Sequence, residues 1–154
     1  MHISKQSAGI LLYKKTGSGL QVFLVHPGGP FFKNKDLGAW SIPKGEFLSD
    51  EDALEAAKRE FKEETGQSIA GNFIKLQPVK LKSGKIVHAW AVEGFIDHQT
   101  ISSNLFEIEW PPKSGKMQSF AEVDRADWFN IDEARLKINA GQVGLIEELV
   151  DLDS

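Results

Sequence analysis

Three glutamates near the middle of the chain have the spacing of neighbours on one face of a helix. Glu60, Glu63 and Glu64 follow each other at i, i+3 and i+4, which places them in one narrow sector of a helix surface. Hard divalent cations prefer oxygen ligands, and Mg²⁺ takes a few carboxylates while keeping water for substrate phosphates. The triplet therefore indicates a metal and phosphate site. Alternatively, the three carboxylates are solvated charges balanced by Arg59 and nearby lysines.

The residues around the triplet favour the metal site. Six positions after Gly45 comes Glu51, and the chain then runs Arg59-Glu60-Phe61-Lys62-Glu63-Glu64-Thr65-Gly66. This pattern over residues 45–67 resembles the Nudix box position by position. The probability that so many positions agree by chance is low. Gln67 departs from the family pattern, which usually has an aliphatic residue there, and Ile69 is a candidate to supply that packing.

The resemblance implies a ligand set for the metal. Glu60 and Glu64 are expected to bind Mg²⁺ or Mn²⁺, and Glu63 either shares the metal or acts as the general base. Gly45 lets the backbone turn tightly, so that the carbonyl of Lys44 completes the metal ligands. The expected reaction is attack of a metal-activated water on phosphorus, with no covalent intermediate.

Further residues are expected to support these carboxylates. Arg59 would orient them through bidentate hydrogen bonds, together with Glu51. Beyond the box, some Nudix enzymes carry an additional carboxylate that binds metal or activates water. Glu122 is our candidate for that position, and Asp124 or Glu109 are alternatives.

The substrate-binding residues are less well specified by the sequence. Aromatic and basic residues in the long loop of residues 27–39, at the entrance to the box and near a second loop can stack on a base or contact phosphates. These candidates are Phe31, Phe32, Lys33, Lys35, Trp40, Lys44, Trp110, Lys113 and Lys116. Trp90 and His88, on an expected strand, are more typical of core or edge residues than of ligands.

Several functions fit the resemblance. Residues 40–45 resemble the entrance of Nudix enzymes that act on dinucleoside polyphosphates, which favours such a substrate. A nucleoside triphosphate is also favoured, and ADP-ribose and an RNA 5′ end are other possible substrates. A catalytically silent Nudix domain that senses a nucleotide or binds a partner is the alternative from another class, although every box carboxylate is present. A Ca²⁺ module is disfavoured, because the EF-hand loop pattern is missing.

The elements that position these residues can be read from the sequence. The resemblance implies an α+β fold, an α/β/α sandwich with a mixed β-sheet between helices, forming a single domain over residues 1–154. Periodicity and turn residues predict strands at 6–13, 20–26, 40–42, 73–81, 86–96, 104–110 and 122–129. Helices are predicted at 50–65, with Ser49 as N-cap and Gly66 at its end, at 131–138, with Asn130 and Glu133 as a capping box, and at 143–150.

The composition restricts the class of protein. The chain has 154 residues, 41% of them hydrophobic, and no apolar run long enough to cross a membrane. Because cysteine is absent, any metal must be held by oxygen or imidazole. A net charge of −4 disfavours a stable nucleic-acid partner. We expect a cytoplasmic monomer or homodimer that acts on a small-molecule nucleotide.

Overall fold

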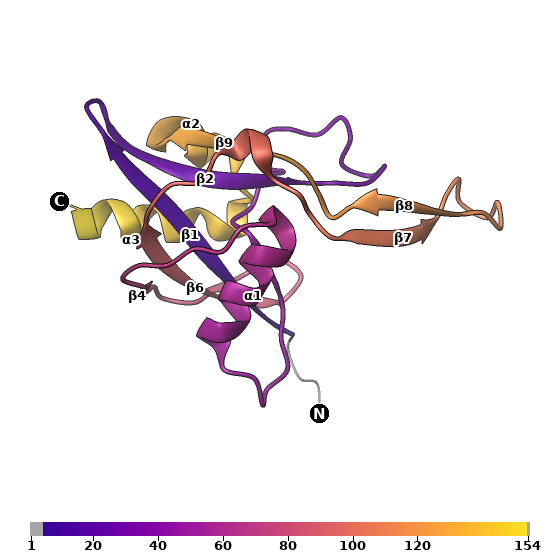
Figure 1. Cartoon of the computed structure of the whole chain (residues 1–154), viewed down its shortest axis with the longest axis horizontal. Coiled ribbons are helices and arrows are strands. Elements are labelled where there is room, and N and C mark those ends of the chain that lie inside the picture. The colour runs from indigo at the N-terminus through magenta and orange to yellow at the C-terminus, as the bar shows by residue number, and fades with distance from the viewer. Residues whose placement is uncertain (1–4, 154) are drawn as a thin grey trace.

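A mixed β-sheet forms the centre of the molecule in the computed structural model, which describes residues 5–153. The order of its main strands is β4-β6-β1-β2-β9, with β3 paired to β1 and β5 paired to β6; β1 and β6 are parallel (Figure 1). The strands are β1 (Gln6–Thr16), β2 (Gly19–Pro27), β3 (Lys44–Glu46), β4 (Ile74–Lys75), β5 (Val79–Lys80), β6 (Ile86–Glu93), β7 (Leu105–Glu109), β8 (Met117–Ala121) and β9 (Val123–Asn130). The helices are α1 (Ala53–Thr65), α2 (Ile131–Lys137) and α3 (Val143–Asp153), with short 3₁₀ turns η1 (His98–Thr100) and η2 (Ala140–Gln142).

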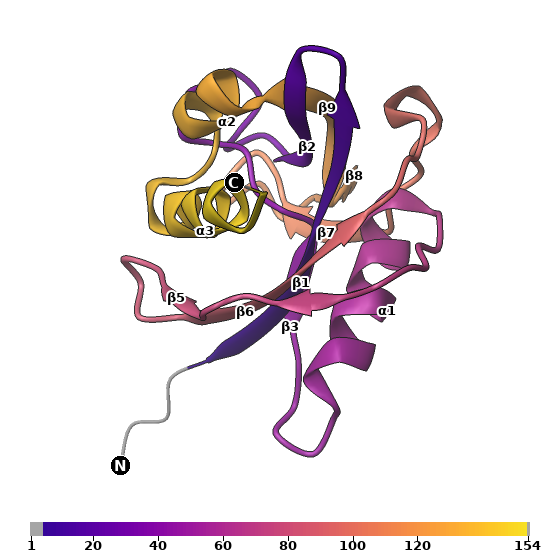
Figure 2. The ribbon, with the colours of Figure 1, turned by 90° about the vertical axis from the view of Figure 1, so that its left-hand side faces the viewer.

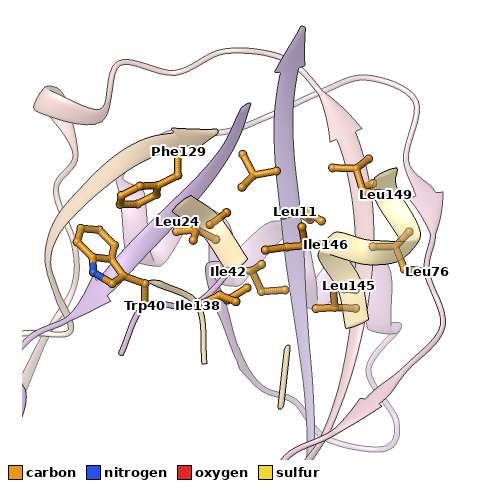
Figure 3. Packing of buried hydrophobic residues seen from close by; sticks show 14 of the residues in the cluster. Leu11, Leu24, Trp40, Ile42, Leu76, Phe129, Ile138, Leu145, Ile146 and Leu149 are labelled. Carbon is orange, nitrogen blue, oxygen red and sulfur yellow. The ribbon is translucent and has the colours of Figure 1, made fainter. Parts of the chain in front are cut away.

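Helices cover both faces of this sheet, as Figure 2 shows, with α1 on one side and α2 and α3 on the other. Side chains alternate across a strand, so β1 contributes to two cores. Ile10 packs towards α1, where it joins Phe61, while Leu11 packs towards α3, where it joins Ile146 (Figure 3). The α+β fold class with a mixed sheet between helices is confirmed.

Helix α1 begins later than the sequence predicts. Its N-cap is Asp52, not Ser49, and the Asp52 carboxylate accepts a hydrogen bond from the backbone N–H of Glu55 at 3.0 Å. Aspartate fulfils the capping requirement as well as serine does, so residues 50–52 remain outside the helix. The predicted end is confirmed, since Gly66 adopts φ 78° and donates its N–H to Lys62.

The strands differ from the predicted ones in four places. Residues 40–42 form only isolated bridges. The strand that pairs with β1 in this region is β3, which begins at Lys44. The strand predicted at 73–81 is reduced to β4 and β5, two short segments on the edge of β6. The strand predicted at 86–96 ends at Glu93. Strand β8 was not predicted at all.

Strands β7 and β8 pair only with each other and form an arm, residues 105–121, that extends away from the central sheet (Figure 1). The long loop of residues 28–39 follows β2, as predicted, and precedes the residues that lead into β3. Asn130 caps α2 by accepting from the N–H of Glu133 at 2.8 Å, which confirms the predicted N-terminus. Among residues 5–153, no helix is long and apolar enough to cross a membrane.

Candidate active site

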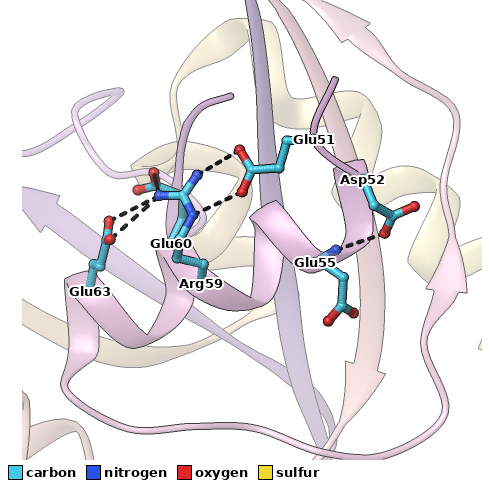
Figure 4. A network of polar contacts seen from close by, with 6 residues as sticks. All are labelled: Glu51, Asp52, Glu55, Arg59, Glu60 and Glu63. Carbon is cyan, nitrogen blue, oxygen red and sulfur yellow. Dashed lines mark hydrogen bonds and ion pairs between the residues drawn. The ribbon is translucent and has the colours of Figure 1, made fainter. Parts of the chain in front are cut away.

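Arg59 connects the acidic residues of α1 to the segment before the helix. Its Nε and Nη2 donate to the two carboxylate oxygens of Glu51 at 3.0 and 3.1 Å (Figure 4). Its Nη1 donates to Glu60 at 2.8 Å and lies 3.4 Å from both oxygens of Glu63. These bonds, Glu51 foremost, raise the pKa of Arg59. Arg59 therefore contacts three acidic side chains, those of Glu51, Glu60 and Glu63.

Glu60 lies against the backbone at the start of the box. Its side chain is buried, with 8% of the residue exposed, and a Cβ added to Gly45 would come within 2.1 Å of its Oε2. Only glycine at position 45 leaves room for this carboxylate. Burial, followed by the charge of Glu63, raises the pKa of Glu60, while Arg59 opposes the shift.

Glu64 is the most strongly perturbed acid of the site. Its Oε1 accepts a hydrogen bond from the backbone N–H of Lys44 at 3.2 Å. Burial nevertheless raises the pKa of Glu64 to about 8. Burial also lowers the pKa of the Lys44 side chain, with a further contribution from the charge of Lys85. The segment at Lys44 and the helix thus meet in a poorly solvated region.

Glu122 joins these residues from the junction between β8 and β9. Burial and the charge of Glu63 raise the pKa of Glu122, and Glu122 lines one cavity together with Glu64. The two alternatives lie elsewhere: Asp124 accepts from the Nδ1 of His26 at 2.8 Å, and Glu109 accepts from the N–H of Lys113 on the arm. Of the three candidates, Glu122 is the one that lines a cavity with Glu64.

A cleft of about 250 Å³ opens beside these groups. Glu64, Lys44 and Glu122 line this carboxylate cleft, with Asn139 and Gln142 from the C-terminal region on another side. Gln142 is 1% exposed, and its Oε1 accepts the N–H of Ile42 at 3.1 Å. Sequence reasoning missed Gln142, because a glutamine one hundred residues from its partner gives no local signal.

The predicted substrate-binding residues separate into groups. Phe32 lines the carboxylate cleft with Lys44, whereas Lys33 lines a second cavity beside the arm. Phe31 contacts the edge of Trp110 on the arm, with ring centroids 5.4 Å apart.

Two other predicted substrate contacts are placed elsewhere. Trp40 is 4% exposed, packs on Phe129, and donates its Nε1–H to Asp36 at 2.8 Å, so it is a core residue and no base can stack on it. Lys116 lies in the exposed turn of the arm. Trp90 is a buried core residue, as the sequence indicates.

The donor set is suited to a divalent cation. All its members are oxygen atoms, and burial is the largest cause of the raised pKa values of three of the carboxylates, Glu60, Glu64 and Glu122. Within residues 5–153, no three histidine, aspartate or glutamate side chains form a ready-made metal site. Glu60 accepts a hydrogen bond from Arg59, and Glu64 accepts one from the backbone of Lys44. Mg²⁺ needs only one or two carboxylates when water and substrate phosphates supply the rest, so the residues fit such an ion.

Comparisons with known proteins agree with this geometry. A family model described as NUDIX domain matches residues 4–149. Similar solved structures include C. elegans Ap4A hydrolase in a binary complex, with 19% identity over 95% of this chain and 96% of that chain and a TM-score of 0.66. The NUDIX domain of Shewanella oneidensis NrtR complexed with ADP ribose has 16% identity over 100% of this chain and 91% of that chain, with a TM-score of 0.66. The E. coli ORF135 protein has 18% identity over 98% of this chain and 93% of that chain, with a TM-score of 0.59. No curated protein matches the chain by sequence.

Proposed function

Because this chain belongs to the NUDIX domain family, we propose that it hydrolyses a phosphoanhydride bond in a nucleoside diphosphate linked to another group. The observation that carries the proposal is a group of three carboxylates with raised pKa values, Glu60, Glu64 and Glu122. Glu64 and Glu122 line one cleft, and the charge of Glu60 contributes to the raised pKa of Glu64. Nucleoside triphosphates or dinucleoside polyphosphates are the substrates we favour. We also propose that residues 1–154 act as one domain, in the cytoplasm, as a monomer or homodimer.

The proposed metal ligands are Glu60, Glu63, Glu64 and the carbonyl of Lys44, for Mg²⁺ or Mn²⁺. A bound divalent cation supplies two things, neutralisation of phosphate charge and a water of lowered pKa. Arg59 keeps Glu60 and Glu63 aligned through its bonds to both. Lys44 lines the cleft, so its ammonium group is our candidate for contact with a phosphate oxygen.

Two carboxylates can accept the proton of the attacking water, Glu63 and Glu122. A raised pKa makes Glu122 a stronger base than an exposed glutamate. Measuring turnover as a function of pH in the variants Glu63→Gln and Glu122→Gln distinguishes their roles. In the wild type, turnover should rise with pH as the base loses its proton, and the substitution that removes this rise identifies the base.

The experiment that tests the function is release of phosphate and nucleotide from a panel of nucleotides with Mg²⁺. We expect metal-dependent turnover that falls by about 100-fold or more in Glu63→Gln and Glu64→Gln. Glu55→Gln is the matched control, because Glu55 lies on the same helix with a largely exposed side chain that pairs with Lys58. Turnover that survives in both variants would refute the assignment. Tight binding without turnover in the whole panel would instead favour the nucleotide-sensing alternative.

A further inference from the structure

A second cavity lies between the 28–39 loop and the inner face of the β7–β8 arm, and we propose that it binds the nucleobase of the substrate. This base slot measures about 500 Å³ and is lined by aromatic and polar side chains, among them Lys33, Trp110, Gln118, Phe120 and Asp124. The inference rests on the proposed function, since it names the part of the substrate that the carboxylates do not contact. Its volume lies within the range of small-molecule sites, roughly 300–1,000 Å³.

The base slot and the carboxylate cleft share two walls. On the loop, Phe32 lines the cleft while its neighbour Lys33 lines the slot. Between β8 and β9, Glu122 lines the cleft while Ala121 and Asp124 line the slot. A single elongated molecule can therefore reach both, with its phosphates beside Glu122 and its other end against the arm.

The arm turns an apolar face towards the loop. Phe106 pairs with Phe120 across β7 and β8, so both rings lie on the same face, while Leu105 pairs with Ala121 and points to the opposite face. Gly29 lies directly against this apolar face, because an added Cβ would come 2.8 Å from the ring of Phe106. The slot is thus bounded by backbone on one side and by aromatic rings on the other, which suits a flat ring system.

The loop wall is held in place without a ligand. His26 is fully buried, and it bonds through Nδ1 to Asp124 at 2.8 Å and through Nε2 to the carbonyl of Lys35 at 2.6 Å. The N–H of Gly28 donates to the carbonyl of Glu122 at 2.9 Å. These bonds fix both ends of the slot relative to the carboxylate cleft, and a preformed site loses less entropy on binding.

The polar groups of the slot suit the edge of a nucleobase. The carboxylate of Asp124 accepts hydrogen bonds, and the ammonium group of Lys33 donates them. A base presents both donors and acceptors at its edge, and its faces stack on aromatic side chains irrespective of the base. The slot therefore fits an aromatic base better than a purely aliphatic or purely anionic group.

The test measures binding of ATP, GTP, CTP, UTP and inorganic tripolyphosphate to the full chain by calorimetry, with Ca²⁺ replacing Mg²⁺ to slow hydrolysis. We expect Trp110→Ala to weaken the tightest nucleotide by about 5- to 150-fold, the range for loss of one stacking contact. Trp110→Phe should restore most of the affinity, and Lys33→Gln should weaken it from the loop side. Leu105→Ala, on the opposite face of the same arm, is the matched control and should leave it unchanged.

Two results would overturn the assignment of the slot as a base-binding site. The first is that Trp110→Ala and Lys33→Gln bind nucleotides as tightly as the wild type does. The second is that tripolyphosphate binds as tightly as every nucleotide. Melting temperatures of Trp110→Ala and Leu105→Ala show whether the arm is intact in both. Binding through Trp110 without turnover would leave the slot standing and refute the hydrolase. Turnover that is indifferent to Trp110 would refute the slot and leave the hydrolase standing.

Discussion

In the metal-free protein, ionisation of Glu64 should lower the free energy of unfolding as the pH rises. The substitution Glu64→Gln should remove this loss. Burial raises the pKa of Glu64 from 4.5 to about 8 in the folded protein. The folded chain therefore retains a proton that the unfolded chain releases, so stability is present below about pH 4.5 and is lost as the pH rises through about 8. At about 1.4 kcal/mol for each pH unit, the loss is at most about 5 kcal/mol. The nearby ammonium group of Lys44 reduces this loss of stability, because its positive charge compensates the new negative charge on Glu64.

The assay is urea unfolding of wild type and Glu64→Gln in EDTA at pH 5, 7 and 9. The glutamine keeps an oxygen for the N–H of Lys44, so the variant differs from the wild type mainly in the charge. We expect the stability difference between the two proteins to shift in favour of the variant as the pH rises. Glu55→Gln controls for loss of a surface charge on the same helix. Parallel pH curves for wild type and Glu64→Gln would refute a buried, titrating Glu64.

Added Mg²⁺ should reverse the effect at high pH. A carboxylate must lose its proton before it can bind a metal, so Mg²⁺ should stabilise the wild type more at pH 9 than at pH 5. The same addition should stabilise Glu64→Gln less. Equal stabilisation of both proteins would mean that Glu64 is not a ligand.

Three further substitutions test single contacts of the site. Gly45→Ala places a methyl group against Glu60, so we expect Mg²⁺ affinity, measured by calorimetry, to fall by about 10-fold or more; unchanged affinity would count against Glu60 as a ligand. Arg59→Lys keeps the charge but loses the paired bonds to Glu51, and turnover should fall by about 10- to 100-fold at an unchanged melting temperature. Gln142→Ala leaves a buried backbone N–H without its acceptor and should cost about 1–3 kcal/mol in urea unfolding; a loss below about 0.5 kcal/mol would show that water replaces the amide.

Local patterns made the helix and its acidic face predictable. The i, i+3, i+4 spacing of the three glutamates and the glycine that ends the helix act over a few residues, so the sequence alone determines them. The same is true of Asn130, whose side chain caps the helix that follows it directly. The start of α1 was harder to predict, because Ser49 and Asp52 are both good caps and only packing against the sheet selects between them.

Long-range pairing decided what the sequence could not. The run Lys44–Glu46 contains a glycine and follows a proline, which is typical of a turn, yet it forms a strand because β1 offers it a free edge. Trp40 has an aromatic ring at the entrance to the box, as a base-stacking residue would. Its ring is nevertheless buried in the core, where it packs on Phe129 and donates a hydrogen bond to Asp36. Neither partner is recognisable from the residues next to Trp40.

The base slot shows most clearly why the fold was needed. The alternation of apolar and acidic residues over 105–109 predicts that β7 has two faces, but which of them meets the 28–39 loop depends on β8, whose polar residues gave no strand signal. Once β8 pairs with β7, Phe120 lies beside Phe106, and the arm gains one apolar face against Gly29. Lys33 and Trp110, two separate candidates for substrate contact in the sequence, then line a single cavity. Specificity in this chain is therefore expected to depend on the arm and the loop together, so that shortening either should abolish the preference among bases while the carboxylates stay in place.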